Sequence, residues 1–204
     1  LFMNNDEFYD SLSIEILEDF AEKTFGKDLP SDVERLLKLL NSHSKVLEIG
    51  CGTGRIGIEL IKDGFEYFGI DKQKKYLDLF LEKINRKKLG NKDFELINKS
   101  FEEFDFDNKF KFILFSWTVI GDFSKEEQLL AIKKTYRLLL KDGICILENP
   151  AKGETYNELN LYNPTPFYYE DWKKELTKIG FSHYSKEYFT KTGVKRELTI
   201  LKKI

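Results

Sequence analysis

The chain has 204 residues and carries 33 lysines and arginines against 35 aspartates and glutamates, a formal net charge of −2. This balance argues against a polybasic nucleic-acid-binding arm and against an acidic tail. Hydrophobic residues make up 41% of the chain and charged residues 33%, with four prolines, a composition that excludes intrinsic disorder as the main interpretation.

The sequence offers no signal for a membrane, an export pathway or a metal. No uninterrupted apolar run approaches the roughly 20 residues of a membrane span, and no basic and apolar leader opens the chain. We therefore expect a cytoplasmic protein. Cys51 and Cys145 are too few for a disulfide framework, and with His43 and His183 as the only histidines we expect reduced thiols and no metal site.

Two helices are expected before residue 45. Apolar residues recur with a helical period over Phe8–Phe25, and a glycine and a proline follow. Ser31 has the side chain of a helix N-cap, and a second apolar stripe extends over Val33–Leu40. Residues 1–44 are thus expected to form a helical segment preceding the core of a single domain.

From Val46 onward, short apolar runs alternate with segments of helical periodicity. Strands are expected at residues 46–49, 67–70, 94–97, 110–115 and 144–147. The run at 110–115 is apolar except for Lys111, which is typical of a strand covered on both faces at the centre of a sheet. Ser124 and Glu127 form a capping-box pair that opens a helix extending up to Gly143. This alternation predicts an α/β fold with a doubly wound, mostly parallel sheet between two helical layers.

The pattern changes after Pro150. Residues 150–168 are rich in aromatic residues and too long for a bare connection, so we expect a functional loop there. A short helix at 169–179 should end at Gly180. Two strands, 182–189 and 194–201, follow as a hairpin, which gives a seven-stranded sheet with an antiparallel C-terminal strand.

The glycine cluster after the first expected strand is the most informative stretch of the sequence. Gly50, Gly52 and Gly54 allow a sharp turn and a close approach of backbone to ligand, because a Cβ would block both. The helix that follows directs its free N–H groups into the same crevice. Asp71 ends the second strand 21 residues after Gly50, where an acid accepts hydrogen bonds from ribose hydroxyls in nucleoside-binding folds. The alternative is a tight turn in which Asp71 merely caps the next helix.

The glycine spacing leaves the type of nucleoside open. A dinucleotide fingerprint counted from Gly50 fails, because Arg55 occupies the third glycine position. A match exists two residues later, at Gly52, Gly54 and Gly57. An NAD(P)- or FAD-dependent oxidoreductase therefore remains an alternative.

The stretch LEIGCGTGR at residues 47–55 resembles the first motif of the class I S-adenosylmethionine-dependent methyltransferases. The resemblance runs from about Lys45 to the C-terminus, includes the closing hairpin, and implies a Rossmann-like core over residues 45–204. It implies that Gly50, Cys51 and Gly52 line the methionine end of the cofactor. Glu48 would orient this loop or, through water, the cofactor ammonium, and Asp71 would hold the ribose.

The same resemblance assigns the adenine end of the cofactor. Lys72 and Gln73 would lie beside the adenine, and Ser100 and Phe101 would frame it through backbone and ring. Many relatives have Asp where Ser100 stands, so this chain departs from the family pattern at the contact to the adenine amino group.

Residues near the acceptor are less defined by sequence. Ser116 and Trp117 would close the cofactor pocket, and the alternative for Trp117 is a core aromatic. Methyl transfer needs chiefly alignment and exclusion of water, so a dedicated catalytic residue is not required. Candidate general bases are Glu148, Tyr9 and Tyr162. The alternative role of Glu148 is a solvated charge at a strand end. The alternative roles of Tyr9 are a cation–π contact to the sulfonium and plain packing.

The expected acceptor is a small molecule. Residues 116–119 lack the Asn/Asp-Pro-Pro-Tyr/Phe signature of amino-methylating nucleic-acid enzymes, and no Pro-Cys pair marks a pyrimidine-methylating nucleophile. The N-terminal helices and the aromatic loop at 156–169 would form a substrate lid. A protein of the same fold that binds a nucleoside or a partner chain without catalysis is the remaining alternative.

Overall fold

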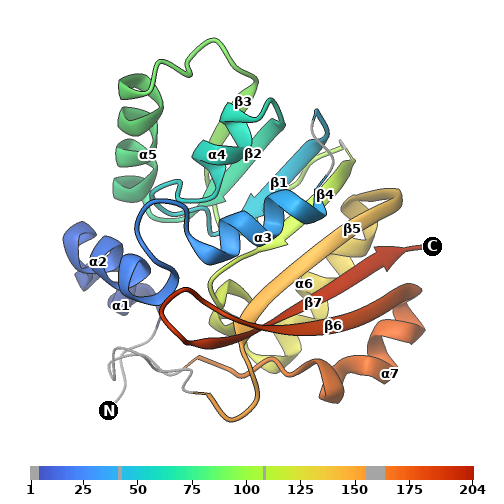
Figure 1. Ribbon diagram of the computed structural model, residues 1–204. Coiled ribbons are helices and arrows are strands. Elements are labelled where there is room, and N and C mark those ends of the chain that lie inside the picture. Colours follow the sequence, from blue (N-terminus) through green and yellow to red (C-terminus); the bar gives the residue numbers. More distant parts are fainter. Residues whose placement is uncertain (1–4, 41–42, 108, 155–163) are drawn as a thin grey trace.

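The computed structural model describes residues 5–40, 43–107, 109–154 and 164–204 (Figure 1). Its centre is a seven-stranded sheet with the order β3-β2-β1-β4-β5-β7-β6. The strands are β1 (Lys45–Ile49), β2 (Glu66–Asp71), β3 (Phe94–Asn98), β4 (Phe110–Phe115), β5 (Leu139–Pro150), β6 (Phe181–Phe189) and β7 (Lys195–Lys203). Strands β1 to β5 run parallel, and β7 lies antiparallel between β5 and β6. The predicted fold class is confirmed, including the central place of β4.

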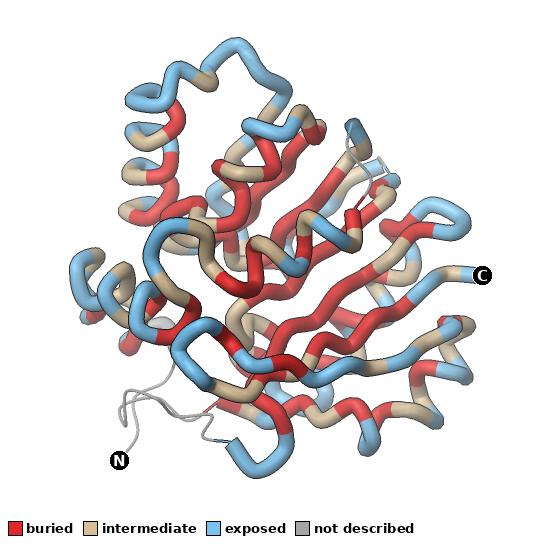
Figure 2. Tube along the Cα trace, viewed as in Figure 1, coloured by how far each residue is buried: buried red, intermediate tan, exposed pale blue. Residues whose placement is uncertain are grey.

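Helices cover both faces of the sheet. They are α1 (Asn5–Ser11), α2 (Ile14–Phe25), α3 (Ser31–Leu39), α4 (Gly57–Lys62), α5 (Lys74–Arg86), α6 (Lys125–Leu138) and α7 (Tyr169–Ile179), with a short 3₁₀ helix η1 (Val119–Asp122) after β4. Helices α3, α4 and α5 pack on one face and α6 and α7 on the other (Figure 1). In β1, Val46 packs in the core beneath α3, α4 and α5, and Leu47 packs in the core beneath α6 and α7, as expected of a strand buried on both faces. The inner strands of the sheet, such as β1, β2 and β4, are accordingly the most buried part of the molecule (Figure 2).

The N-terminal helical segment differs from its prediction in two details. The single helix expected over Phe8–Phe25 is divided, because Ser13 adopts an extended conformation and its hydroxyl accepts the Ile16 N–H at 3.3 Å as the N-cap of α2. Ser31 does not cap α3, whose N-cap is Pro30. The Ser31 hydroxyl instead donates to the Phe25 carbonyl at 2.7 Å and so closes the α2–α3 connection.

The ends of the later helices follow local chemistry. The Ser124–Glu127 capping box is present at the start of α6, and Gly180 ends α7 in the left-handed conformation with φ +108°, as predicted. Helix α6 ends at Leu138, earlier than expected, because Leu139 is already extended and pairs with Phe110 in β4. In the part of the chain that is described, no helix is long and apolar enough to cross a membrane.

Candidate functional site

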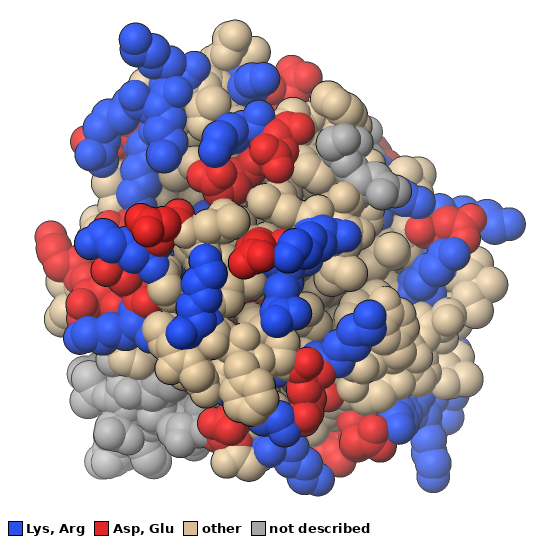
Figure 3. All heavy atoms as spheres, in the orientation of Figure 1, with Lys and Arg blue, Asp and Glu red and all other residues tan. Residues whose placement is uncertain are grey.

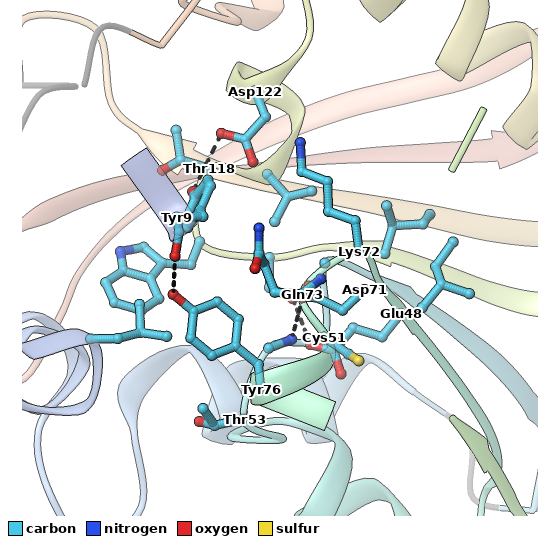
Figure 4. A pocket seen from close by; sticks show the side chains of 18 of the residues that line it. Tyr9, Glu48, Cys51, Thr53, Asp71, Lys72, Gln73, Tyr76, Thr118 and Asp122 are labelled. Carbon is cyan, nitrogen blue, oxygen red and sulfur yellow. Dashed lines mark hydrogen bonds between the residues drawn. The ribbon is translucent and has the colours of Figure 1, made fainter. Parts of the chain in front are cut away.

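A cavity of about 1420 Å³ lies at the carboxyl ends of β1, β2 and β4. This is the edge at which open parallel sheets bind ligands. Its walls come from the glycine loop after β1, the start of α5, the segments after β3 and β4, and helices α1 and α2. Figure 4 shows how side chains of the glycine loop, α5, α1 and the segment after β4 face one another. All eleven residues expected at the cofactor site line it: Glu48, Gly50, Cys51, Gly52, Asp71, Lys72, Gln73, Ser100, Phe101, Ser116 and Trp117.

The glycine loop bends back over the end of β2. The N–H groups of Gly50 and Cys51 both donate to the Ile70 carbonyl, at 2.8 and 3.1 Å. Gly50 has φ +65°, and a Cβ there would lie 2.6 Å from a methyl carbon of Val119. Gly52 has φ +52° with open space where its Cβ would be. The loop thus needs one glycine for packing and another to leave room above the backbone.

Asp71 joins this loop to α5. One carboxylate oxygen accepts the Gly52 N–H at 2.8 Å, and the other accepts the Gln73 N–H at 2.8 Å. Burial raises the pKa of Asp71, while these two backbone hydrogen bonds oppose the rise. The contact to the glycine loop means that Asp71 does more than cap the following helix. Its carboxylate lies in the cavity wall, where each oxygen retains capacity for a further donor.

Glu48 lies beneath the glycine loop and is 3% exposed. Its carboxyl oxygens accept hydrogen bonds from the Tyr67 hydroxyl at 2.5 Å and the Ser116 hydroxyl at 3.1 Å. Burial raises the pKa of this carboxyl to about 7, although both hydrogen bonds and the nearby Arg55 lower it. The hydrogen bond from Ser116 to Glu48 therefore links the end of β4 to the end of β1, where the glycine loop begins.

Ser100 and Phe101 lie at the end of the cavity expected to take the adenine. The Ser100 N–H and hydroxyl both donate to the Glu103 carboxylate, at 3.3 and 3.2 Å, and form a local turn. The Phe101 ring packs edge-on against Phe115, with centroids 5.6 Å apart, and is 4% exposed. This ring is therefore fixed by the core behind it.

Trp117 lines the cavity beside α2. Its ring stacks on Phe20, with centroids 6.2 Å apart and planes 9° apart, and meets Phe25 edge-on at 5.8 Å. The Arg55 guanidinium lies 5.5 Å from the centroid of the same ring. Trp117 thus lines the cavity and also packs against aromatic rings of α2, so both of its sequence interpretations find support in its contacts.

Helix α1 closes the cavity through contacts that the sequence does not reveal. The Lys75 ammonium donates to three carbonyls at the end of α1, those of Tyr9, Asp10 and Leu12, at 2.7 to 3.0 Å. The Tyr76 hydroxyl also donates to the Tyr9 carbonyl, at 3.2 Å. A cation among the free carbonyls at the end of a helix is a favourable pairing.

Tyr9 is thereby held over the cavity, and its hydroxyl donates to Asp122 of η1 at 3.4 Å (Figure 4). Burial and the negative charge of Asp122 raise the pKa of Tyr9, which keeps the phenol protonated. Sequence reasoning missed Asp122, because an acid in a short 3₁₀ turn carries no motif.

The other two candidate bases fare differently. Glu148 does not lie at the pocket mouth: it is absent from the cavity lining, is 1% exposed and forms an ion pair with Arg196. Its alternative as a solvated strand-end charge is also wrong. Tyr162 lies outside the described residues. Within the described ranges, no group of three or more His, Cys, Asp or Glu is arranged to hold a metal ion. The Cys51 thiol is buried, which raises its pKa and disfavours a thiolate.

Solved structures of similar fold include several methyltransferases. A TehB-like S-adenosylmethionine-dependent methyltransferase from Corynebacterium glutamicum is 17% identical, with 97% of each chain covered and a TM-score of 0.69. Magnesium protoporphyrin IX methyltransferase from Synechocystis, solved with bound S-adenosylmethionine, is 18% identical, with 97% of this chain and 92% of that chain covered and a TM-score of 0.69.

A third structure of this fold is the Burkholderia thailandensis 1,6-didemethyltoxoflavin-N1-methyltransferase with its acceptor and S-adenosylhomocysteine. It is 14% identical, with 97% of this chain and 84% of that chain covered and a TM-score of 0.74. No curated protein sequence matches the chain. A family model described as a methyltransferase domain matches residues 40–198, nearly the whole core. The chain belongs to this methyltransferase domain family.

Proposed function

We propose that the protein transfers a methyl group from S-adenosylmethionine to a small-molecule acceptor bound in the cavity at the end of β1, β2 and β4. The observation that carries this proposal is the Asp71 carboxylate, held in the cavity wall and hydrogen-bonded to the glycine loop. Family membership supplies the reaction class, and the residues around Asp71 supply a place for the ribose.

The residues present fit this cofactor. A cavity of about 1420 Å³ exceeds the roughly 300 to 1,000 Å³ of ordinary ligand sites, so a donor and an acceptor have room together. Asp71 can accept the ribose hydroxyls, and the space above Gly52 allows a ligand to approach the backbone. Gly54 and Gly57 differ from Gly52, because a Cβ at either would strike Phe80 within 2.5 Å. Gly54 therefore packs against Phe80, where the second glycine of a dinucleotide site leaves space for the pyrophosphate, and this difference together with the family match sets the dinucleotide alternative aside.

The chain's own contribution to the reaction is alignment and exclusion of water. When bound, S-adenosylmethionine supplies a methyl group already activated by its sulfonium. Glu48, fixed by Tyr67 and Ser116, holds the end of β1 beneath the methionine moiety, and its carboxylate favours the cofactor ammonium. Trp117 and Tyr9 cover the cavity from the acceptor side and keep water out.

A small-molecule acceptor suits the surroundings of the cavity. The segment 1–44 is proposed as a lid, since α1 and α2 contribute the outer wall. On the face shown in Figure 3, basic and acidic side chains are interspersed, without the continuous basic surface that a nucleic-acid partner favours. Two of the neighbouring structures are named for small-molecule acceptors, a porphyrin and a toxoflavin precursor.

Binding and transfer are tested separately. Titration of the protein with S-adenosylhomocysteine in a calorimeter should release heat, and a saturating concentration should raise Tm. NADH should produce neither effect. Incubation of the protein with cell extract and methyl-labelled donor should then yield a labelled low-molecular-weight product. Binding without any labelled product would favour a non-catalytic role, and absence of binding would contradict the proposal.

A further inference from the structure

Trp117 and Thr118 form a strained turn at the end of β4. Their φ angles are +47° and +70°, in the left-handed region that residues other than glycine rarely adopt. Two such residues in succession persist only where the surroundings hold them. Because both residues line the cavity, the conformation of this turn sets the shape of its wall.

Both peptide N–H groups of the turn are held by Glu148. The Trp117 N–H donates to a Glu148 carboxylate oxygen at 2.9 Å, and the Thr118 N–H donates to the Glu148 carbonyl at 2.9 Å. Arg196 adds a third tie, since its Nη2 donates to the Thr118 hydroxyl at 3.0 Å. One acid and one base behind the wall therefore fix both residues of the turn.

Glu148 is itself fixed by its neighbours in the sheet. Arg196 donates to both carboxylate oxygens, from Nε at 2.5 Å and from Nη2 at 2.9 Å, and the Tyr188 hydroxyl donates to one of them at 3.2 Å. The three residues come from adjacent strands β5, β7 and β6, and the acid and the arginine are 1% and 0% exposed. Such a paired, bidentate arrangement leaves the carboxylate a single orientation.

The other side of the turn reaches the ligand-binding elements. The Trp117 ring stacks on Phe20 of the lid helix α2, and Val119 occupies the space beside the Gly50 Cα. A rotation of the Trp117–Thr118 peptide would move both contacts. The buried ion pair is thereby connected to the glycine loop and to the lid without lining the cavity itself.

We propose that Glu148 and Arg196 are positioning residues, which hold the Trp117–Thr118 turn in its left-handed conformation and so set the acceptor-side wall of the cavity. The inference rests on the proposed function only in taking this wall of the cavity to be the one that faces the methyl acceptor. It predicts that breaking the pair changes the environment of Trp117 and weakens ligand binding, beyond any general loss of stability.

Fluorine NMR on protein labelled with 5-fluorotryptophan tests this directly, because the chain has two tryptophans and one is an internal control. Trp172 is buried in α7 and stacks on Phe167, and it has no ring contact with Trp117 among those of the described residues. Spectra of Trp172→Phe assign the two resonances. Glu148→Gln places an amide donor against N–H donors and is expected to shift or broaden the Trp117 resonance while the Trp172 resonance stays in place. Equal changes at both resonances, or none at Trp117, would overturn the proposal.

A second variant separates positioning from stability. Glu148→Met with Arg196→Met removes both charges, and buried ion pairs replaced by apolar side chains often retain stability. We expect this double variant to fold, to keep the altered Trp117 resonance, and to bind S-adenosylhomocysteine on the order of tenfold more weakly. If the double variant recovered the Tm, the Trp117 resonance and the affinity of the unaltered protein together, the pair would have a purely structural role and our proposal would be wrong.

Two controls complete the design. The first is Glu187→Gln, which breaks the ion pair between Glu187 and Lys195 on the same hairpin. This pair is partly exposed, with 2.6 Å between nitrogen and oxygen. Its loss should leave the Trp117 resonance and the affinity for S-adenosylhomocysteine unchanged. If S-adenosylhomocysteine fails to bind the unaltered protein, the proposed function fails, but the ligand-free Trp117 spectra still decide the positioning inference.

Discussion

Replacing Glu48 by glutamine is expected to remove a pH dependence of stability that this buried carboxyl creates. Burial raises the pKa of Glu48 from 4.5 to about 7. Between these values the unfolded chain has released a proton that the folded protein retains. The interval corresponds to about 3 kcal/mol of unfolding free energy.

The sign follows from the direction of the pKa change. Below pH 4.5 the carboxyl of Glu48 is protonated in both the folded and the unfolded protein, so no free energy of unfolding is lost to its ionisation. As pH rises toward about 7, the unfolded state is favoured increasingly, so the unaltered protein loses up to about 3 kcal/mol relative to Glu48→Gln. Glutamine should fit the site, because its neighbours Tyr67 and Ser116 present hydroxyls that rotate to accept from an amide.

Urea denaturation of both proteins from about pH 5 to about pH 8 measures the effect, since the difference between the two curves cancels all other titrating groups. Calorimetric titration with S-adenosylhomocysteine over the same range gives a second readout. A ligand ammonium near Glu48 favours the carboxylate, so affinity for the unaltered protein should rise as pH passes about 7, and the variant should lose this rise. Parallel stability curves would refute the assignment of a raised pKa to this carboxyl.

Four further substitutions test the site and the helix that covers it. Gly50→Ala places a Cβ 2.6 Å from Val119, so Tm should fall clearly, whereas the Cβ of Gly52→Ala meets open space and should mainly weaken S-adenosylhomocysteine binding. Thermal unfolding and calorimetric titration measure the two effects. A larger loss of Tm for Gly52→Ala than for Gly50→Ala would contradict the loop geometry. Asp71→Ala should cost about 1.5 to 3 kcal/mol of binding free energy by calorimetry, and an unchanged Kd would remove it from the site. Lys75→Met should raise amide hydrogen exchange in α1 while α7 keeps its protection; unchanged exchange in α1 would show that the helix is held by other contacts.

Most of the core, and the meeting of the residues proposed for the donor in one cavity, could be predicted because their signals are local in sequence. Each strand of the core shows its own apolar run, and the capping box at Ser124 lies within four residues. The glycine loop and Asp71 are likewise tied by chain spacing, since β1 and β2 are consecutive and neighbouring parallel strands bring their carboxyl ends together. All eleven expected cofactor residues consequently line one cavity.

The side of the cavity proposed for the acceptor depends on contacts that no local sequence pattern records. Glu148 looks like an exposed strand-end acid until Arg196, 48 residues later, pairs with it across β5 and β7. Exposure is the common fate of such an acid, and only the neighbouring strand decides otherwise. The division of the N-terminal helix at Ser13 was hidden for a related reason, because the apolar period continues through the break.

The glycine loop also anchors the segment proposed as the lid. The Thr53 hydroxyl donates to Glu18 of α2 at 3.2 Å, and Glu18 forms an ion pair with Lys83 of α5. Arg55, two residues further along the loop, pairs with the fully buried Asp32 of α3. A ligand that engages the loop at Gly52 therefore contacts the same short backbone segment that holds α2 and α3. Because that segment is shared, we expect donor binding at Gly52 to be coupled to the position of α2 and α3.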